Sequence, residues 1–297
     1  MHQKPEQQVQ IISLGAGTDT RPFKLGHMEP ETVGRILYHE LDFPAVSKKK
    51  YEHASNCEFM DEVKCPGTKD MSMLDALRKG GTVNPEADVW GWTTKSGCGY
   101  MFHPVDLREV AKTGEFPEAS KNHFRNDMIT VLISECCLCY MTAPEADAVI
   151  NYFTNRIDTI GIILYEPMKP YDAFGTMMTE NLASRGLSMP SIKTYHDLQT
   201  QVVRLRNCGF DMFQEGASIE WLWLNWFDED EHLRQMKLQQ VDEEEEWNLL
   251  AGHYLICWAV KEGENCDDAF AGWDHMEGEV ERMLKEKGPI VETNESR

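Results

Sequence analysis

Three acidic residues, Asp42, Asp106 and Glu135, each stand at or directly after the end of an apolar segment. The carboxyl ends of parallel strands meet at one edge of an open α/β sheet, where such folds bind their ligands. We therefore expect the three carboxylates to line one crevice. Each could instead cap a following helix, which suits Asp106 well. Capping explains Glu135 less well, because burying a lone carboxylate is costly.

A glycine turn, Gly15-Ala16-Gly17, lies between an apolar run and a polar stretch that begins at Thr18. This pattern predicts a strand, a tight turn and a helix start, the place where a nucleotide-like ligand binds. A dinucleotide fingerprint would need a third glycine at position 20, where Thr20 stands. Taken alone, the two glycines are equally consistent with a structural turn.

The acids narrow down the ligand. Asp42 lies 27 positions after Gly15, near the offset of about 20 residues expected for an acid that binds ribose hydroxyls. A ligand with adenine, ribose hydroxyls and an ammonium group would use all three carboxylates. S-adenosylmethionine has these groups and lacks the diphosphate that a third glycine would serve. A nicotinamide-dependent oxidoreductase is the alternative, disfavoured by Thr20 and by the two further acids.

The elements that must position these residues alternate between strands and helices, which predicts a parallel α/β sheet. Residues 57–97 interrupt the alternation and are interpreted as an insertion or long loop, and 262–297 as a loosely attached, charged tail. Helical periodicity in 166–208 predicts a helical insertion after the fifth strand. Strands are expected at residues 9–14, 35–42, 100–105, 128–135, 159–165 and 252–259, and a further strand is expected to follow the helix end at 208–210.

Charge and composition exclude several classes of protein. The formal charge of −21 disfavours binding to nucleic acid or to an anionic membrane, because such binders need clusters of Lys and Arg. The 41% of hydrophobic residues supply a core, and the apolar stretch at 128–141 is too short to span a bilayer. Nine cysteines without an apolar leader favour a reduced, cytoplasmic protein.

Competing chemistries find little support. Cys136, Cys137 and Cys139 include a Cys-x-x-Cys spacing without a second cluster, so buried packing is favoured over zinc and we expect no metal. The sequence contains no Gly-x-Ser-x-Gly nucleophile elbow and no Gly-x4-Gly-Lys phosphate loop.

Six ordered motifs between about Gln8 and Lys261 resemble the leucine carboxyl methyltransferases. The motifs are Leu14-Gly15-Ala16-Gly17-Thr18-Asp19-Thr20, Glu40-Leu41-Asp42-Phe43-Pro44, Glu135-Cys136-x-x-x-Tyr140-Met141-Thr142, Tyr165-Glu166-Pro167, Phe174-Gly175-x-x-Met178-x-Glu180-Asn181-Leu182 and His253-Tyr254-x-x-Cys257-Trp258-Ala259. The resemblance implies a Rossmann-like class I S-adenosylmethionine-dependent methyltransferase domain over residues 1–261, with helices on both faces of the sheet. It also implies methylation of the C-terminal leucine carboxylate of a protein phosphatase 2A type catalytic subunit. A related branch acts on transfer RNA in wybutosine synthesis, which the −21 charge disfavours.

By motif, the resemblance places the methionine part of S-adenosylmethionine against Gly15 and its ribose on Asp42. The resemblance also implies that Asp106 and Leu107 contact the adenine, and that Glu135 holds the amino group of the cofactor.

On the acceptor side, Tyr140 is the candidate catalytic residue that orients the reacting carboxylate, with aromatic packing as the alternative. Tyr165 and residues 166–185 are expected to line the peptide entrance.

One departure from the family concerns basic residues. Members of the family carry a segment before the first strand with a Lys and an Arg-Gly motif that hold the cofactor carboxylate. Here the first strand begins near residue 9, and the matched motifs hold no basic residue for that role. We expect either a truncated gene model or isoform, or a cofactor-impaired binding protein on the same fold.

Overall fold

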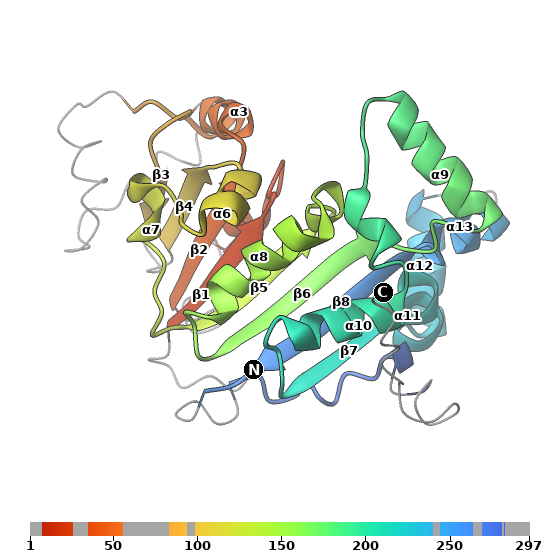
Figure 1. Cartoon of the computed structure of the whole chain (residues 1–297). Coiled ribbons are helices and arrows are strands. Elements are labelled where there is room, and N and C mark those ends of the chain that lie inside the picture. The colour runs from red at the N-terminus through yellow and green to blue at the C-terminus, as the bar shows by residue number, and fades with distance from the viewer. Residues whose placement is uncertain are drawn as a thin grey trace, which may run out of the picture.

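The structure is a computed structural model, and it describes residues 8–25, 35–55, 83–93, 99–239, 244–263, 269–280 and 282. Its centre is an eight-stranded sheet with the order β3-β4-β2-β1-β5-β6-β8-β7 (Figure 1). The strands are β1 (Gln8–Leu14), β2 (Arg35–Asp42), β3 (Trp90–Thr93), β4 (Gly99–Pro104), β5 (Ile129–Glu135), β6 (Ile160–Pro167), β7 (Phe213–Ser218) and β8 (Tyr254–Lys261).

Strand direction identifies the type of sheet. β4, β2, β1, β5 and β6 pair in parallel, whereas β8 runs antiparallel to both β6 and β7. Apart from the short edge strand β3, which is antiparallel to β4, the sheet has a single reversed strand, β8, and β1 lies in the middle of its parallel part. This is the arrangement of Rossmann-like class I S-adenosylmethionine-dependent methyltransferases. The predicted fold class is confirmed. Ligands bind at the carboxyl ends of the parallel strands in such folds.

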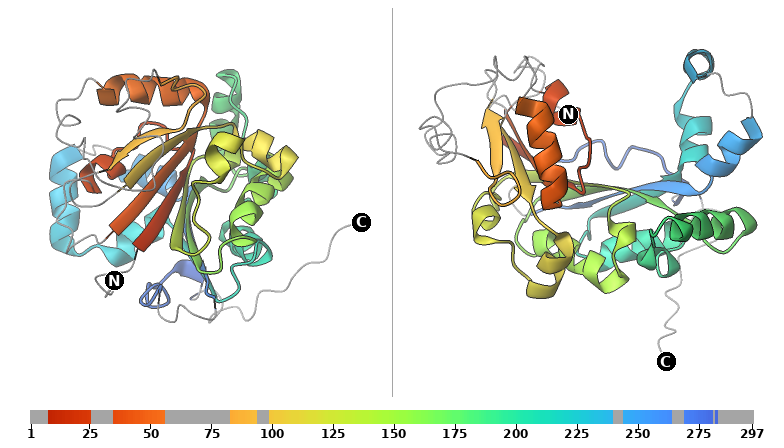
Figure 2. Two further views of the ribbon diagram at one scale, coloured as in Figure 1. Left: turned by 90° about the vertical axis from the view of Figure 1, so that its left-hand side faces the viewer. Right: turned by 90° about the horizontal axis from the view of Figure 1, so that it is seen from above.

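Helices cover both faces of the sheet (Figure 2). They are α1 (Arg21–Leu25), α3 (Pro44–Ser55), α6 (Leu107–Thr113), α7 (Glu118–Lys121), α8 (Ala143–Thr154), α9 (Ala173–Ser184), α10 (Leu198–Asn207), α11 (Ile219–Trp226), α12 (Glu229–Gln239) and α13 (Glu244–Ala251), with 3₁₀ turns η1 (Leu138–Tyr140) and η2 (Pro190–Lys193).

Each face of the sheet has its own apolar core. On one face, α6, α8 and α10 bury residues such as Val149 and Leu205 against Leu132 and Ile162 of the central strands. On the other face, aromatic residues of β2, β3 and β4 pack against α1 and α3. Strands covered on both sides must be apolar nearly throughout, as β5 is.

The end of the 57–97 segment belongs to the sheet, so its residues 90–93 are a strand and not a loop. Residues 90–93 form β3, antiparallel to β4. Trp90 is buried, its ring stacks on Phe102 with centroids 5.4 Å apart, and its Nε1 donates to Ser47 Oγ at 2.8 Å. Residues 57–82 and 94–97 of the predicted insertion lie outside the described residues.

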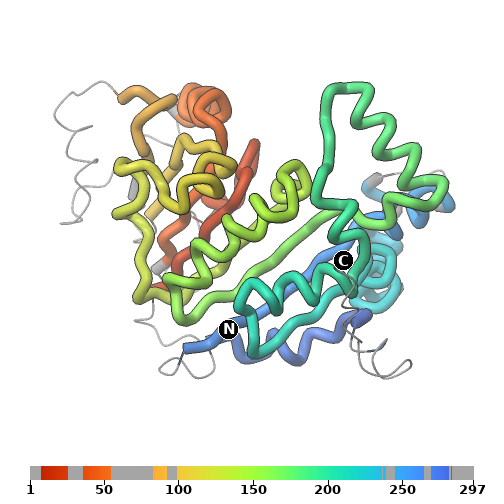
Figure 3. Tube along the Cα trace, viewed as in Figure 1, coloured from red at the N-terminus to blue at the C-terminus, as the bar shows by residue number. Residues whose placement is uncertain are grey.

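The segment 269–280 is packed onto the body, so the prediction of a loosely attached tail is wrong for these residues. Val280 joins the main core, and Glu279 accepts hydrogen bonds from the backbone and side chain of Ser218 at the end of β7. Phe270 packs on the opposite face against Val131. Figure 3 shows this dark-blue segment beside β7. Only four of its twelve residues have polar side chains, namely Asp274, His275, Glu277 and Glu279, so the segment has enough apolar surface for this attachment.

A buried histidine pair connects β2 with β4. His39 Nδ1 lies 2.9 Å from His103 Nε2, and both rings are fully buried. Burial, with the charge of nearby His123 as a smaller cause, lowers the pKa of His39 to about 3. Burial also holds the pKa of His103 well below its usual value. Both rings are therefore neutral in the folded protein.

This pair makes the stability of the protein sensitive to acid. The folded-state pKa values lie below the unfolded value of about 6.5, so stability is full above pH ~6.5 and is lost as the pH falls. We expect the free energy of unfolding to fall by up to about 1.4 kcal/mol per pH unit for each histidine between pH ~6.5 and ~5. Urea denaturation over this pH range measures the effect.

The matched variants are the double substitution His39→Leu with His103→Leu and the single substitution His275→Leu, whose side chain is 84% exposed. The double variant should lose stability less steeply with acid than the parent protein, because leucine at positions 39 and 103 cannot bind a proton in the unfolded state. His275→Leu should follow the parent. Equal slopes for all three proteins would mean that the buried pair does not control acid stability.

Candidate functional site

The turn after β1 is wedged between two other parts of the chain. Gly15 has φ +63° and Gly17 has φ +52°, both in the left-handed region. A Cβ atom on Gly15 would lie 2.6 Å from Cys137 Sγ, and the Gly15 amide donates to Leu41 O at 2.8 Å. Position 15 therefore requires glycine for two reasons, its backbone conformation and the lack of room for a side chain. Because position 15 has no side chain, the backbone at the end of β1 stays accessible from the pocket.

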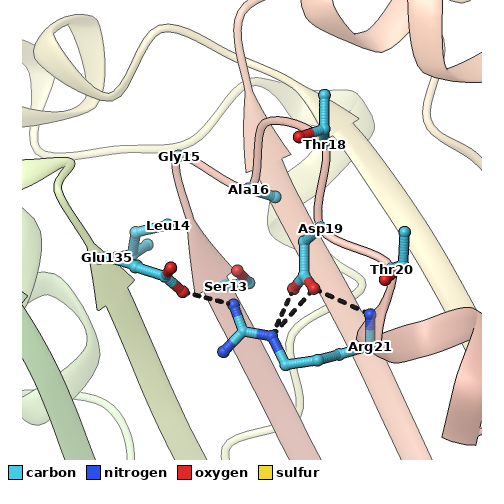
Figure 4. A pocket seen from close by; sticks show the side chains of 9 residues that line it. All are labelled: Ser13, Leu14, Gly15, Ala16, Thr18, Asp19, Thr20, Arg21 and Glu135. Atoms are coloured by element: carbon cyan, nitrogen blue, oxygen red, sulfur yellow. Dashed lines mark hydrogen bonds and ion pairs between the residues drawn. The ribbon is translucent and has the colours of Figure 1, made fainter. Parts of the chain in front are cut away.

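A pocket of about 350 Å³ opens at this turn, at the carboxyl ends of β1 and β5 (Figure 4). Its lining residues come from the end of β1, from the turn that follows and from the last residue of β5. They are Ser13, Leu14, Gly15, Ala16, Thr18, Asp19, Thr20, Arg21 and Glu135. Of the predicted cofactor residues, Gly15 and Glu135 thus line one pocket.

Arg21 links the two acids of this pocket. Its Nε lies 2.9 Å from both carboxylate oxygens of Asp19, and its Nη2 donates to Glu135 Oε2 at 2.9 Å. Burial would raise the pKa of Asp19, but the hydrogen bonds and charge of Arg21, together with the Tyr38 hydroxyl, hold it below its usual value. The Arg21 and Glu135 side chains are 43% and 59% exposed. Such an exposed ion pair is worth only about 0–1 kcal/mol, so a ligand can displace it.

Asp42 lies on the other side of the glycine turn. Its Oδ2 accepts the Gly17 amide and its Oδ1 the Phe43 amide, both at 2.7 Å. The Asp42 carbonyl accepts the Val105 amide at 2.8 Å, which brings the end of β2 to the end of β4. Asp42 is therefore next to the pocket, although it is not one of its lining residues.

Asp106 follows β4 and caps α6. Its Oδ1 accepts the Arg108 amide at 3.0 Å, and its Oδ2 accepts from Arg108 Nη2 at 2.7 Å. The hydrogen bond of the Arg108 side chain lowers the pKa of Asp106 below its usual value. The capping role considered from the sequence is thus present. The Leu107 side chain is buried in the main core, so only its backbone is free to face a ligand.

The turn after β5 carries Tyr140 at the end of η1. The side chain of Tyr140 is partly exposed, and burial of its hydroxyl raises its pKa to about 12, so the phenol stays protonated near neutral pH. Glu166, fully buried at the end of β6, holds this turn. Burial raises the pKa of Glu166 to about 7, while the charge of Arg204, the Cys139 thiol and the amides of Leu138 and Cys137 act in the opposite direction.

Tyr165 lies beside Glu135, because the two residues are register partners on β6 and β5. The Tyr165 ring stacks on Tyr254 with centroids 5.4 Å apart and planes 14° apart. The Tyr165 carbonyl accepts the Cys136 amide at 2.9 Å, which ties β6 to the turn that carries Tyr140. Tyr165 thus adjoins the glycine pocket through its neighbour Glu135.

Sequence reasoning missed the Asp19–Arg21–Glu135 arrangement. The matched motifs hold no basic residue, but Arg21, directly after the first of them, reaches into the pocket. The available signal was the polar run from Thr18 to Arg21 directly after the glycine turn. Which acid an arginine pairs with depends on the tertiary contact between β1 and β5, which local sequence does not reveal.

Two further findings concern other classes of site. Within the described part of the chain, no three His, Cys, Asp or Glu side chains are grouped so that they could hold a metal ion. None of the described helices has the length and apolar character needed to cross a membrane.

Comparison with known proteins places the chain in a family. Leucine carboxyl methyltransferase 1 of Emericella nidulans is 34% identical over 285 residues, covering 91% of this chain and 69% of that protein. The Aspergillus fumigatus protein of the same name is 35% identical, covering 91% and 70%. A homolog from Arabidopsis thaliana is 30% identical, covering 85% and 69%. The chain thus spans about seven tenths of the length of these relatives.

Similarity to solved structures is more distant. An O-methyltransferase family protein from Burkholderia thailandensis matches with a TM-score of 0.41 and 12% identity, covering 86% of this chain and 51% of that one. The assignment of the fold rests on the strand order. The family model for leucine carboxyl methyltransferase matches residues 2–154. With this match and the relatives above, the chain belongs to the leucine carboxyl methyltransferase family.

Proposed function

We propose that this protein methylates the α-carboxylate of a C-terminal leucine, on the tail of a protein phosphatase 2A type catalytic subunit, using S-adenosylmethionine. Family membership supports the leucine carboxyl chemistry. The observation that carries the proposal is the pocket that joins Gly15 to Glu135, with Asp42 beside it. The identity of the phosphatase comes from the family resemblance.

The residues at the pocket fit S-adenosylmethionine, which supplies a methyl group on a positively charged sulfur. Gly15 leaves room for close approach to the backbone. Each carboxylate oxygen of Asp42 accepts one amide and keeps a lone pair for a ribose hydroxyl. Glu135 accepts from the amino group, and Arg21 pairs with the carboxylate of the cofactor.

Asp106 and the backbone of Leu107 would hold adenine. They follow β4, directly beside the end of β2, so adenine and ribose would be bound by neighbouring strands. The hydrogen bonds that Asp106 makes to Arg108 fix the orientation of its carboxylate.

The acceptor needs no general base, because a C-terminal carboxylate is already ionised near pH 7. The task of the chain is to hold one carboxylate oxygen in line with the methyl group and to exclude water. Positioning of this kind can contribute about 7–11 kcal/mol. The protonated Tyr140 hydroxyl is suited to donate to the other oxygen, and Tyr165, beside Glu135, would lie on the acceptor side.

The first test concerns Arg21. Arg21→Gln should weaken binding of S-adenosylmethionine by about 1.5–3 kcal/mol, the range for hydrogen bonds to charged groups. Decarboxylated S-adenosylmethionine lacks the group that Arg21 binds. Its affinity for Arg21→Gln should therefore be nearly the same as its affinity for the parent protein. Calorimetric titration of both ligands measures the difference.

Arg125→Gln is the matched control, because Arg125 pairs with the exposed Asp127 rather than with a residue of the pocket. It should leave both affinities unchanged. If Arg21→Gln weakened both ligands equally, Arg21 would act on the fold of the pocket and not on the cofactor carboxylate.

The second test concerns the acceptor. A peptide that ends in leucine should accept a methyl group, whereas the same peptide ending in leucinamide should accept none, because the amide lacks the anionic oxygen. Transfer of radiolabelled methyl groups measures both. Comparable labelling of the two peptides would place the chemistry on another group, such as a side chain.

A further inference from the structure

A second pocket, of about 230 Å³, lies between α9 and the first residue of β8. We call it the α9 pocket. Its lining is mainly apolar, with one cation and one amide. The lining residues are Phe174, Met177, Met178, Asn181, Leu182, Arg185 and Tyr254.

The α9 pocket adjoins the glycine pocket through a pair of tyrosines. Glu135 lines the glycine pocket and is the register partner of Tyr165. Tyr165 stacks on Tyr254, which lines the α9 pocket. With strands about 4.8 Å apart, the two pockets are separated by roughly 10 Å. Figure 1 shows α9 beyond the carboxyl end of β6, on the side of the sheet where β1 and β5 also end.

The amino-terminal end of α9 is firmly held. Asp172 caps the helix by accepting the Gly175 amide, and its carboxylate contacts His253 Nε2 at 2.9 Å. The other ring nitrogen of His253 lies 2.7 Å from Leu249 O. Along the helix, Met178 and Leu182 pack on a small buried cluster formed by Cys139, Met189 and Ile192. The pocket therefore has a fixed wall before any ligand binds.

The rim of the pocket exposes unusually large apolar side chains. Met177, one of its lining residues, is 61% exposed. Exposed apolar groups that gather around a concave site mark a binding surface. Methionine adapts its shape to different partners, which suits a site for an apolar side chain.

Arg185 supplies charge complementarity. Its guanidinium lines the pocket, and among the described residues no carboxylate pairs with it. In a chain with a formal charge of −21, a cation left unpaired beside an apolar pocket favours an occupant that is apolar and carries a negative charge nearby.

We propose that the α9 pocket binds an apolar side chain of the acceptor peptide, upstream of its terminal leucine, while Arg185 pairs with a carboxylate of the same peptide. An extended chain advances about 3.3–3.6 Å per residue, so a residue about two to four positions before the leucine spans the separation. The inference rests on the proposed function, because it takes the terminal leucine to lie at the glycine pocket.

The experiment is a scan of acetylated octapeptides of alanine and serine that end in leucine. One isoleucine is placed at each of the five positions before the leucine in turn, and binding is measured by calorimetry with S-adenosylhomocysteine present. Isoleucine at one position, two to four before the leucine, should tighten binding about fivefold to tenfold relative to alanine.

Met177→Ser should abolish this gain. The matched control is Met212→Ser, which truncates a methionine of the same 61% exposure outside the pocket. It should retain the gain. Affinity for S-adenosylhomocysteine reports that each variant is folded.

A second pair of peptides tests the charge. An aspartate next to the preferred isoleucine should bind several-fold more tightly than asparagine there, and Arg185→Gln should remove that difference.

The proposal is overturned if no position shows a preference, if the gain persists in Met177→Ser, or if only the side chain of the terminal leucine matters. It is also overturned if no peptide binds while S-adenosylhomocysteine does. Failure of the proposed function has a different signature. If the leucinamide version of the preferred peptide were methylated as well, the carboxylate chemistry would be wrong, but the isoleucine preference would still support the α9 pocket.

Discussion

The lack of space at position 15 is the constraint on which the rest of the site depends. The turn after β1 has to pass between Leu41 at the end of β2 and Cys137 after β5, and it does so only without a side chain and in a left-handed conformation. This packing brings the ends of three parallel strands together. It places Glu135 on one side of the turn and Asp42 on the other.

Charge balance follows from this arrangement. Asp42, Asp106 and Glu135 stand at or just after the carboxyl ends of β2, β4 and β5, and Arg108 pairs with Asp106 while Arg21 pairs with Glu135. The Arg21–Glu135 pair is exposed enough to exchange for the amino and carboxylate groups of an amino-acid ligand. In the proposed function, the same two side chains pair with each other before binding and would contact the ligand afterwards.

The sequence predicted the parts of the fold in which local pattern and burial agree. The bounds of β2 match the expected 35–42, and β5 was evident because a strand covered on both faces must be apolar. β3 has only four residues, one of them glycine, and the attachment of 269–280 depends on single residues such as Val280. Neither leaves a periodic pattern to detect. In the candidate site, the acids at strand ends were predictable from topology, whereas the Arg21–Glu135 and Asp172–His253 contacts join residues far apart in the sequence.

A crystal structure of the protein with S-adenosylhomocysteine tests the central claim most directly. The account predicts the homocysteine part at the glycine turn, with its amino group about 3 Å from the Glu135 carboxylate and its carboxylate at Arg21. The ribose hydroxyls should then lie at Asp42. A ligand bound elsewhere, or one bound with the Arg21–Glu135 pair intact and the amino group pointing away from Glu135, would contradict it.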